Sequence, residues 1–255
     1  MNRKLLIFSF LLFSALSVKA GVEFDGTTGY IRIAAPSFSQ LTTQTWSFWI
    51  KPDTGGGGNL GRIIHLRDNV SGLPSIVMAN SSAFGSQTIR FEYGATGNFV
   101  VRVAVSSTIV FGLWNHVSVS YNGSTLTTVD PRIFVNGVEV AINPAFNSTT
   151  GTPNPTLATG SVYIGNRSDG IRTFDGTIDD VRVYNRILSD AELESLGKAQ
   201  TRLVITDGLV AWWKLDEQID GATAQGATAL DSSGNGNTGS GSGGPDYRNG
   251  ILNYP

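Results

Sequence analysis

The sequence predicts an all-β protein, built as an antiparallel sandwich or barrel. Short stretches alternate apolar and polar residues, turn residues separate them about every eight to fifteen positions, and long helical periodicity is almost missing before residue 189. Successive side chains of a strand point to opposite faces, so alternation is expected of a strand with one buried face. Many short strands joined by Gly, Pro and Asn turns are typical of sandwiches and barrels.

The composition indicates a substantial core and no strongly charged partner. Apolar residues make up 40% of the chain, charged residues 15%, and the formal net charge is −2. Nothing in this balance points to nucleic acid or to a membrane bound through charge. The chain has no cysteine, so we expect its core, with or without a metal ion, to hold it together instead of disulfides.

Residues 1–20 have the pattern of a secretory signal peptide. A basic start at Asn2 to Lys4 precedes an apolar run, and small residues precede a cut after Ala20. The apolar run is short for a membrane span, and no other stretch approaches the required length. We expect a mature chain of residues 21–255, secreted or held at the extracellular surface, and the lack of cysteine favours a bacterial source.

Strand patterns follow one another through the first half of the chain. The predicted strands lie at 21–33 (two strands and a turn), 45–51, 62–66, 75–78, 88–93 and 99–105. The glycine run from Gly55 to Gly58 lies after the 45–51 strand and predicts a flexible loop. Gly94 and Gly97 join the last two strands into an antiparallel pair.

The second half begins with the same pattern. Predicted strands lie at 113–121, 132–135, 138–141 and 161–165. Asn136-Gly137 separates the second and third of these, and predicts a hairpin because both central residues of its turn need positive φ. Residues 143–160 are rich in Pro, Thr and Asn and are expected to form a loop.

The stretch from Phe174 to Leu196 combines a strand with the one predicted helix. Strict alternation places two sets of side chains on opposite faces: Ile178, Asp180, Arg182 and Tyr184 on one, and Asp179, Val181, Val183 and Asn185 on the other. Ser189 and Glu192 then form an S-x-x-E capping box, and Gly197 stands where the helix would end. We expect one short helical turn near 189–197.

The composition changes after residue 200. Residues 203–215 are strongly strand-forming and include Trp212 and Trp213, which must face opposite ways. Residues 218–244 are rich in Gly, Ala, Ser and Thr, and cannot form a core of their own. This segment must therefore lie against another part of the chain or stay mobile.

Six phrases together resemble a known family. They are FDGTTGYIRI (24–33), WSFWIKP (46–52), WNHVSVSYNGSTL (114–126), IFVNGVEV (133–140), VYIGNRSDG (162–170) and FDGTIDDVRVYNRILSDAEL (174–193). In this order they are similar to the laminin-G-like branch of the concanavalin A-like lectin/glucanase superfamily, over nearly all of residues 21–196. The resemblance implies a jelly-roll β-sandwich and says less about the ligand.

The end of the chain resembles the beginning of the same family. GLVAWWKLDEQ (208–218) and DSSGNGN (231–237) are similar to its first strand and first loop, which normally precede a segment like residues 24–33. Residues 208–255 either fold back to supply the missing strand, a circular permutation, or begin a truncated second domain. We favour the first interpretation, because the termini of domains often lie close together and the missing strand would leave an open sheet edge.

Catalysis is not indicated. The related glycosidases of the superfamily carry acidic residues on one strand in a pattern similar to E-x-D-x-E, which aims two carboxylates into a cleft. No strand here has that pattern. Adjacent Asp179 and Asp180 are expected to point to opposite faces. The histidines are His65 and His116, and His116 lies in WNHV, where a packing role is expected. We therefore predict no catalytic residue.

The resemblance implies a structural calcium ion. In relatives, an aspartate at the position of Asp179 binds calcium together with a residue near the first strand and a backbone carbonyl. The corresponding candidates are Asp216 or Glu217, and the turn from Asp25 to Gly29. The alternative is that the aspartates of this strand are surface carboxylates beside arginines.

Sugar binding is the other expectation, because aromatic rings stack on the C–H faces of sugars. We predict Trp49, Tyr93 and Trp114 as ligand-binding residues, with core packing as the alternative for each tryptophan. Ligand loops are expected at 55–59, 80–85 and 143–160.

The most consistent function is an exported, non-catalytic binding or adhesion module. Its partner would be a carbohydrate or an extracellular protein. One alternative is a glycosidase or polysaccharide lyase of the same fold, and another is a structural module of a surface array.

Overall fold

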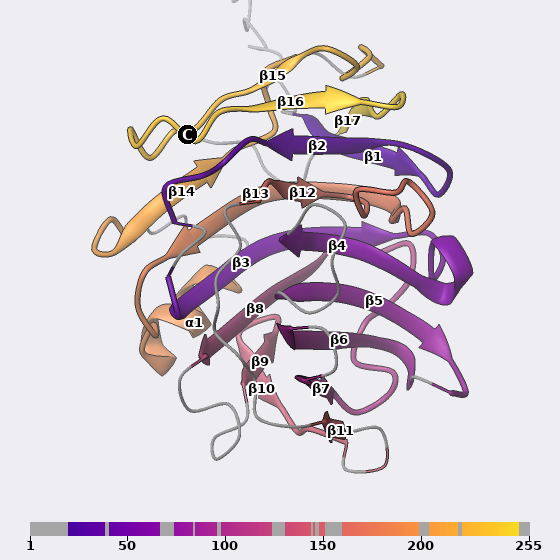
Figure 1. The fold of residues 1–255 in the computed structure, drawn as a ribbon, viewed down its shortest axis with the longest axis vertical. Coiled ribbons are helices and arrows are strands. Elements are labelled where there is room, and N and C mark those ends of the chain that lie inside the picture. The colour runs from indigo at the N-terminus through magenta and orange to yellow at the C-terminus, as the bar shows by residue number, and fades with distance from the viewer. Residues whose placement is uncertain are drawn as a thin grey trace, which may run out of the picture.

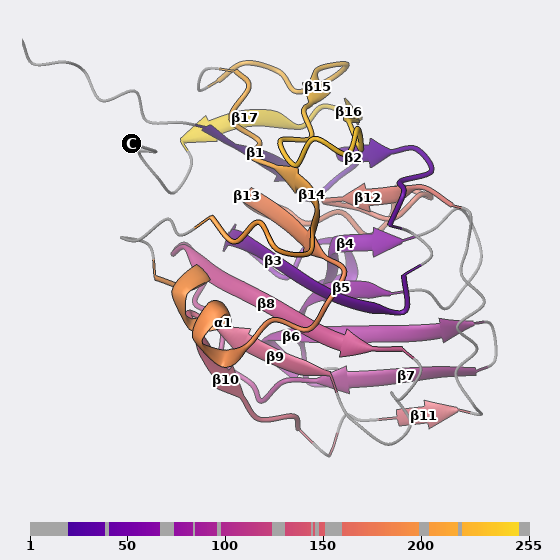
Figure 2. The same cartoon turned by 90° about the vertical axis from the view of Figure 1, so that its left-hand side faces the viewer.

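Two antiparallel β-sheets lie face to face, and one helix covers part of the outside of one sheet (Figure 1; Figure 2). A computed structural model of the chain describes residues 20–38, 41–66, 74–83, 85–95, 98–123, 131–143, 145, 148–150, 160–198, 204–218 and 221–249. The predicted all-β sandwich with one short helix is confirmed. Residues 1–19 of the predicted signal peptide, and most of the 143–160 loop, lie outside the described residues.

The first sheet has eight strands. In spatial order they are β10 (Val138–Val140), β9 (Arg132–Val135), β8 (Asn115–Asn122), β3 (Thr43–Pro52), β13 (Asp175–Tyr184), β1 (Ala20–Asp25) and β17 (Asp246–Asn249), with β14 (Leu209–Trp213) also on β13. β3 pairs with both halves of β13, so β1 and β14 divide the other edge of β13 between them.

The second sheet has nine strands. Their order is β11 (Ser148–Thr150), β7 (Asn98–Val103), β6 (Gly85–Ala95), β5 (Ser75–Ser81), β4 (Leu60–Leu66), β12 (Val162–Ile164), β2 (Tyr30–Ile33), β16 (Gly239–Ser242) and β15 (Thr228–Ala229). A short 3₁₀ turn, η1 (Gly57–Asn59), precedes β4. Strand β11 corrects the expectation of an unstructured loop over 143–160.

The C-terminal segment contributes strands to both sheets. β14 pairs with β13 and β17 with β1 in the first sheet, whereas β16 pairs with β2 in the second. In Figure 1 the yellow strands β16 and β17 lie beside the indigo strands β2 and β1 from the start of the chain. Gly241 of β16 faces inward, where a Cβ atom would collide with the carbonyl oxygen of Ala224. The alternating Gly-Ser sequence of β16 therefore fits a strand with one tightly packed face.

The core lies between the two sheets. Its largest fully buried side chains come from the whole length of the chain, and include Phe24, Phe38, Trp46, Phe48, Phe91, Phe174, Trp213 and Tyr247. Trp213 of β14 is fully buried, its ring contacts Phe38 edge-on at 6.0 Å, and its Nε1 donates to the carbonyl oxygen of Asn237 at 2.7 Å. Trp212 points away from the core cluster, as alternation predicted.

The helix α1 (Asp190–Leu196) covers the outside of the first sheet. Its Leu193 and Leu196 belong to a small apolar cluster with Phe134 and Tyr184 of the sheet. Ser189 and Glu192 form the predicted capping box. Gly197 follows the helix, but with a φ of −76°.

Two glycine positions show different local requirements. Asn136 and Gly137 have φ angles of 52° and 78°, so the predicted hairpin turn between β9 and β10 is confirmed. A Cβ atom on Gly197 would instead collide with the backbone of Gly137. A glycine after α1 is therefore required by the close approach of the helix end to the hairpin, and not by a left-handed helix stop.

The predicted alternation of β13 is wrong across its two aspartates. Asp180 has a φ of 52°, and the register with β3 shifts between Asp179 and Arg182, which marks a β-bulge. As a result, Ile178 shares the core face with Val181 and Val183.

The same bulge changes where the aspartates point. Asp179 lies opposite Trp49 in the ladder, outside the core cluster, and Asp180 contacts Arg182 on that same outer side. The expectation that the two carboxylates point to opposite faces is therefore also wrong.

Candidate functional site

Two of the three aromatic residues expected to bind sugar are buried. Trp49 is 5% exposed, and its ring meets that of His116 at 5.0 Å. Tyr93 is 1% exposed and lies in the core beside Tyr121, where burial raises its pKa to about 12. Trp114 is half-buried immediately before β8. Of the three, only Trp114 has a surface that a ligand reaches without rearrangement.

His116 is enclosed within the first sheet. Its Nε2 lies 2.9 Å from Oγ of Ser47, and the side chain is 1% exposed. Burial, reinforced by the charge of Arg182, lowers the pKa of His116 to about 3. The imidazole is therefore neutral at pH 7 and sealed from solvent, which fits the expected packing role.

Asp25, one of the residues expected to bind calcium, lies apart from Asp179. Asp25 pairs with Asp175 in the β1–β13 ladder, four residues from Asp179 and thus about 13 Å along the strand. Calcium–oxygen distances are about 2.3–2.6 Å, so Asp25 and Asp179 do not share an ion. Asp25 instead accepts hydrogen bonds from the backbone N–H and hydroxyl of Thr27. A Cβ atom on Gly29 would lie 3.2 Å from the backbone nitrogen of Pro245.

The remaining expected calcium ligands lie in the C-terminal segment. Glu217 is half-buried, accepts a hydrogen bond from the backbone N–H of Leu230, and is contacted by the hydroxyl of Tyr247 at 3.3 Å. Burial raises its pKa. Asp216 is also half-buried. Within the described part of the chain, no three His, Asp or Glu side chains form a group able to hold a metal ion, and calcium binding stays a prediction.

Asp180, the aspartate at the β-bulge, forms hydrogen bonds with side chains of β13 and β14. Asp180 accepts hydrogen bonds from Nε and Nη2 of Arg182 at 3.0 and 2.9 Å, and from Nε1 of Trp212 at 2.7 Å. The guanidinium also lies over the Trp212 ring, 4.7 Å from its centroid. Asp180 thereby links β13 to β14, so its carboxylate is used in holding the C-terminal segment to the first sheet.

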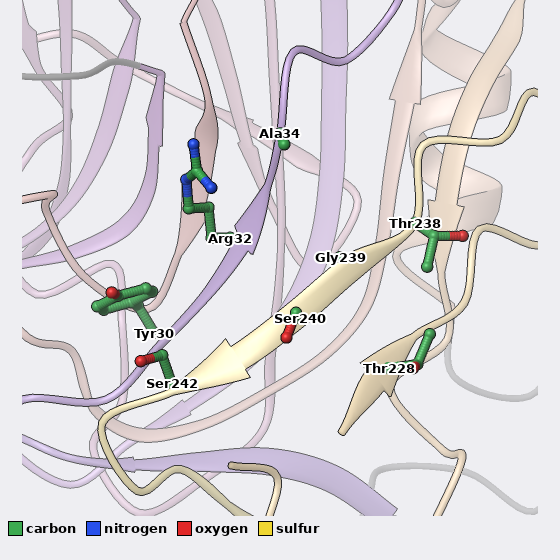
Figure 3. Close-up of a pocket in the computed structure, with 8 residues that line it drawn as sticks. All are labelled: Tyr30, Arg32, Ala34, Thr228, Thr238, Gly239, Ser240 and Ser242. Carbon is green, nitrogen blue, oxygen red and sulfur yellow. The ribbon is translucent and has the colours of Figure 1, made fainter. Parts of the chain in front are cut away.

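A surface groove lies elsewhere, on the outer face of the second sheet (Figure 3). Its volume is about 440 Å³, and β2, β15 and β16 supply its walls. The lining residues are Tyr30, Arg32, Ala34, Thr228, Thr238, Gly239, Ser240 and Ser242. The groove therefore requires strands from both ends of the chain.

Strand register determines which side chains meet in the groove. Ile31 and Ile33 of β2 point into the core, so Tyr30 and Arg32 point outward, side by side (Figure 3). Ser242 lies opposite Tyr30 in the ladder, and Ser240 lies opposite Arg32. One wall thus carries an aromatic ring and a guanidinium, and the other carries hydroxyl groups.

The aromatic ring of the groove is held by a second tyrosine. The ring of Tyr163, on β12, meets that of Tyr30 edge-on at 5.4 Å. Tyr163 is 5% exposed, whereas Tyr30 is half-buried and lines the groove. Tyr30 therefore offers part of its surface to a ligand from a fixed position.

Further along the same sheet face, on β4 and β6, lies a buried cluster of ion pairs. Nη2 of Arg62 lies 3.1 Å from Oε2 of Glu92, and Nε of Arg90 lies 2.8 Å from Oε1 of that carboxylate. Arg62 is 7% exposed, and burial lowers its pKa from the ordinary arginine value. Nε and Nη1 of Arg62 have no hydrogen-bond partner among the described residues.

The groove residues were not predicted from the sequence. The alternation of Tyr30, Ile31, Arg32 and Ile33 does indicate that the tyrosine and arginine face outward. Their meeting with Ser240, however, depends on a pairing between segments some two hundred positions apart, which no local pattern reveals.

Comparison with known proteins identifies the family. A laminin-G-type family model, described as concanavalin A-like lectin/glucanases superfamily, matches residues 25–194. The chain belongs to this superfamily, as the six sequence phrases indicated. No curated protein sequence matches the chain significantly.

Solved structures share the fold at low sequence identity. A structure from Bacteroides ovatus ATCC 8483, described as a candidate carbohydrate-binding protein, matches with 20% identity and a TM-score of 0.63, covering 91% of this chain and 60% of the other. The chain thus spans less than two thirds of that protein. The CBM40 domain of Ruminococcus gnavus IT-sialidase, solved with α2,3-sialyllactose, matches with 17% identity and a TM-score of 0.54, covering 71% and 97%. Among the described residues, no helix is both long and apolar enough to cross a membrane.

Proposed function

We propose that the chain is an exported, non-catalytic carbohydrate-binding module, and that the groove between β2 and β16 is its ligand site. The observation that carries the proposal is the composition of the groove walls, where the Tyr30 ring and the hydroxyl groups of β15 and β16 line the same groove. Sugars present C–H faces that suit an aromatic ring and hydroxyl groups that suit short polar side chains. A groove of about 440 Å³ is within the size range of small-ligand sites.

Similarity in fold adds general support. Both solved structures described above are named for carbohydrate binding or for a bound saccharide. A shared fold alone does not define a ligand, so the proposal depends on the groove residues of this chain.

Binding without catalysis is favoured over a glycosidase by the carboxylates of this sheet face. A glycosidase needs two carboxyl groups about 5 to 9 Å apart, one of them free to act as an acid. Glu92 forms ion pairs with both Arg62 and Arg90, and the lining of the groove contains no Asp or Glu. These features support a recognition role.

We also propose that residues 208–255 supply the first strand and loop of the superfamily domain, as the circular permutation requires. The pairing of β14 with β13 and of β16 with β2 supports this proposal over a truncated second domain. The ligand site would then depend on the segment that comes last in the chain.

The ligand site is tested by a glycan panel followed by isothermal titration calorimetry. Tyr30→Ala should weaken the best ligand about fivefold, because an aromatic contact contributes about 1 kcal/mol. Trp114→Ala, which alters a half-buried aromatic residue immediately before β8 of the other sheet, is the matched control and should leave the affinity unchanged. A panel without any bound glycan, or a loss of affinity only in Trp114→Ala, would refute the proposal.

A further inference from the structure

We propose that the groove selects an anionic saccharide, and that Arg32 binds its carboxylate or sulfate group. This inference rests on the proposed carbohydrate-binding function, and goes further by naming the class of sugar. The lining of the groove contains one charged side chain, Arg32, together with neutral hydroxyl groups and the Tyr30 ring. The groove therefore has an uncompensated positive charge.

Arg32 differs from most arginines in the described part of the chain, because it has no counterion there. Arg132, Arg182 and Arg186 each form ion pairs with carboxylates at 2.6 to 2.9 Å. Among the residues that the structure describes, no ion pair or hydrogen bond engages Arg32, and this residue is exposed. A guanidinium has five N–H donors in a planar fork that matches a carboxylate or sulfate group. Arg32 is thus available for a bidentate contact.

Neighbouring groups suit the remainder of a sugar ring. Ser240 lies directly across the ladder from Arg32, and Tyr30 lies two residues away on the same face of β2. A saccharide whose acidic group meets Arg32 can therefore rest against Tyr30 and form hydrogen bonds with the Ser240 hydroxyl. This arrangement places the charged contact and the ring contact on one monosaccharide or on two adjacent ones.

The adjoining part of the sheet face increases the positive potential. β12 separates β2 from β4, so Arg62 lies on a strand about 10 Å from that of Arg32. Arg62 and Arg90 both pair with Glu92, and Arg167 and Arg172 are close enough to Arg62 to lower its pKa further. A charged oligosaccharide extending from Arg32 across β12 would approach this cluster.

The test uses calorimetry on the full chain with charged probes and a matched neutral probe. The charged probes are oligogalacturonate, 3′-sialyllactose and a sulfated oligosaccharide, and the neutral probe is methyl-esterified oligogalacturonate, which keeps the sugar backbone without its charge. We expect at least one charged probe to bind, with an affinity that falls as NaCl rises from 0.05 to 0.5 M. The neutral ester should bind at least tenfold more weakly than the free acid if oligogalacturonate is the bound probe.

Variants of Arg32 test whether its guanidinium binds the acidic group of the ligand. Arg32→Gln should weaken the charged ligand at least tenfold, and Arg32→Lys should restore only part of the affinity because it lacks the bidentate fork. Arg132→Gln makes the same change of net charge on the other sheet and should bind as the unmodified protein does. Thermal unfolding of each variant shows that it is folded.

The outcomes separate this inference from the proposed function. Binding of neutral glycans only, or charged-glycan binding that Arg32→Gln leaves intact, would overturn the anionic assignment and leave the carbohydrate-binding proposal standing. Failure to bind any charged or neutral glycan would overturn both.

Discussion

Replacing Trp213 by alanine tests whether the C-terminal segment belongs to the core of the sandwich. The side chain is fully buried, its ring contacts Phe38, and its Nε1 donates to the carbonyl of Asn237. Truncation of a buried tryptophan costs about 3–5 kcal/mol, and the orphaned carbonyl adds about 1 kcal/mol or more. We expect the free energy of unfolding to fall by about 4–6 kcal/mol, which lowers Tm by about 8–24 °C for a domain of this size.

The assay is urea and thermal unfolding followed by circular dichroism. Leu230→Ala is the matched control, because Leu230 lies in the same segment and is 54% exposed, and its effect should stay within about 0.5 kcal/mol. If Trp213→Ala unfolds within about 1 kcal/mol of the unmodified protein, β14 is not part of the cooperative unit. The proposed permutation would then be wrong, and a separate second domain would be favoured.

Three further changes test local features. Asp180→Asn removes the carboxylate that pairs with Arg182 inside the protein, and should lower the free energy of unfolding in urea by about 3–5 kcal/mol. A decrease under about 1 kcal/mol would contradict a stabilising role for this buried ion pair. The pKa of His116 is about 3 in the folded chain and about 6.5 in the unfolded chain. The stability that its neutral form contributes is therefore complete above about pH 6.5. As the pH falls below 6.5, the free energy of unfolding decreases by up to about 1.4 kcal/mol per pH unit. His116→Gln should therefore flatten the stability profile between pH 6.5 and 5, and an unchanged slope would show that the imidazole is protonated in the fold. Ser189→Ala should lower stability by about 1 kcal/mol through loss of the helix cap, and an unaltered Tm would show that the capping box contributes nothing.

Features set by neighbouring residues could be predicted from the sequence. The Asn136-Gly137 turn needs only two residues with positive φ, and the capping box needs only Ser189 and Glu192 at the right spacing. Alternation likewise identified most strands, because each half-buried strand carries its own pattern. These elements required no knowledge of their tertiary partners.

Features set by tertiary contacts could not be predicted in this way. A bulge at Asp180 inserts one residue into β13 and reverses the faces that simple alternation assigns around Ile178. Tyr93 was expected at a ligand site, but its strand places it toward the opposite sheet. The groove appears only when β16 is paired with β2, so the sequence could indicate that Arg32 faces outward without showing its surroundings.

The claim that Arg32 binds an acidic saccharide predicts where such a ligand lies on the protein. A crystal structure of the full chain with the tightest charged ligand of the panel should show its carboxylate or sulfate oxygens about 2.7–2.9 Å from the Arg32 guanidinium, with the sugar ring against Tyr30. A ligand bound instead at Trp114, or anywhere away from the β2–β16 groove, would contradict the claim.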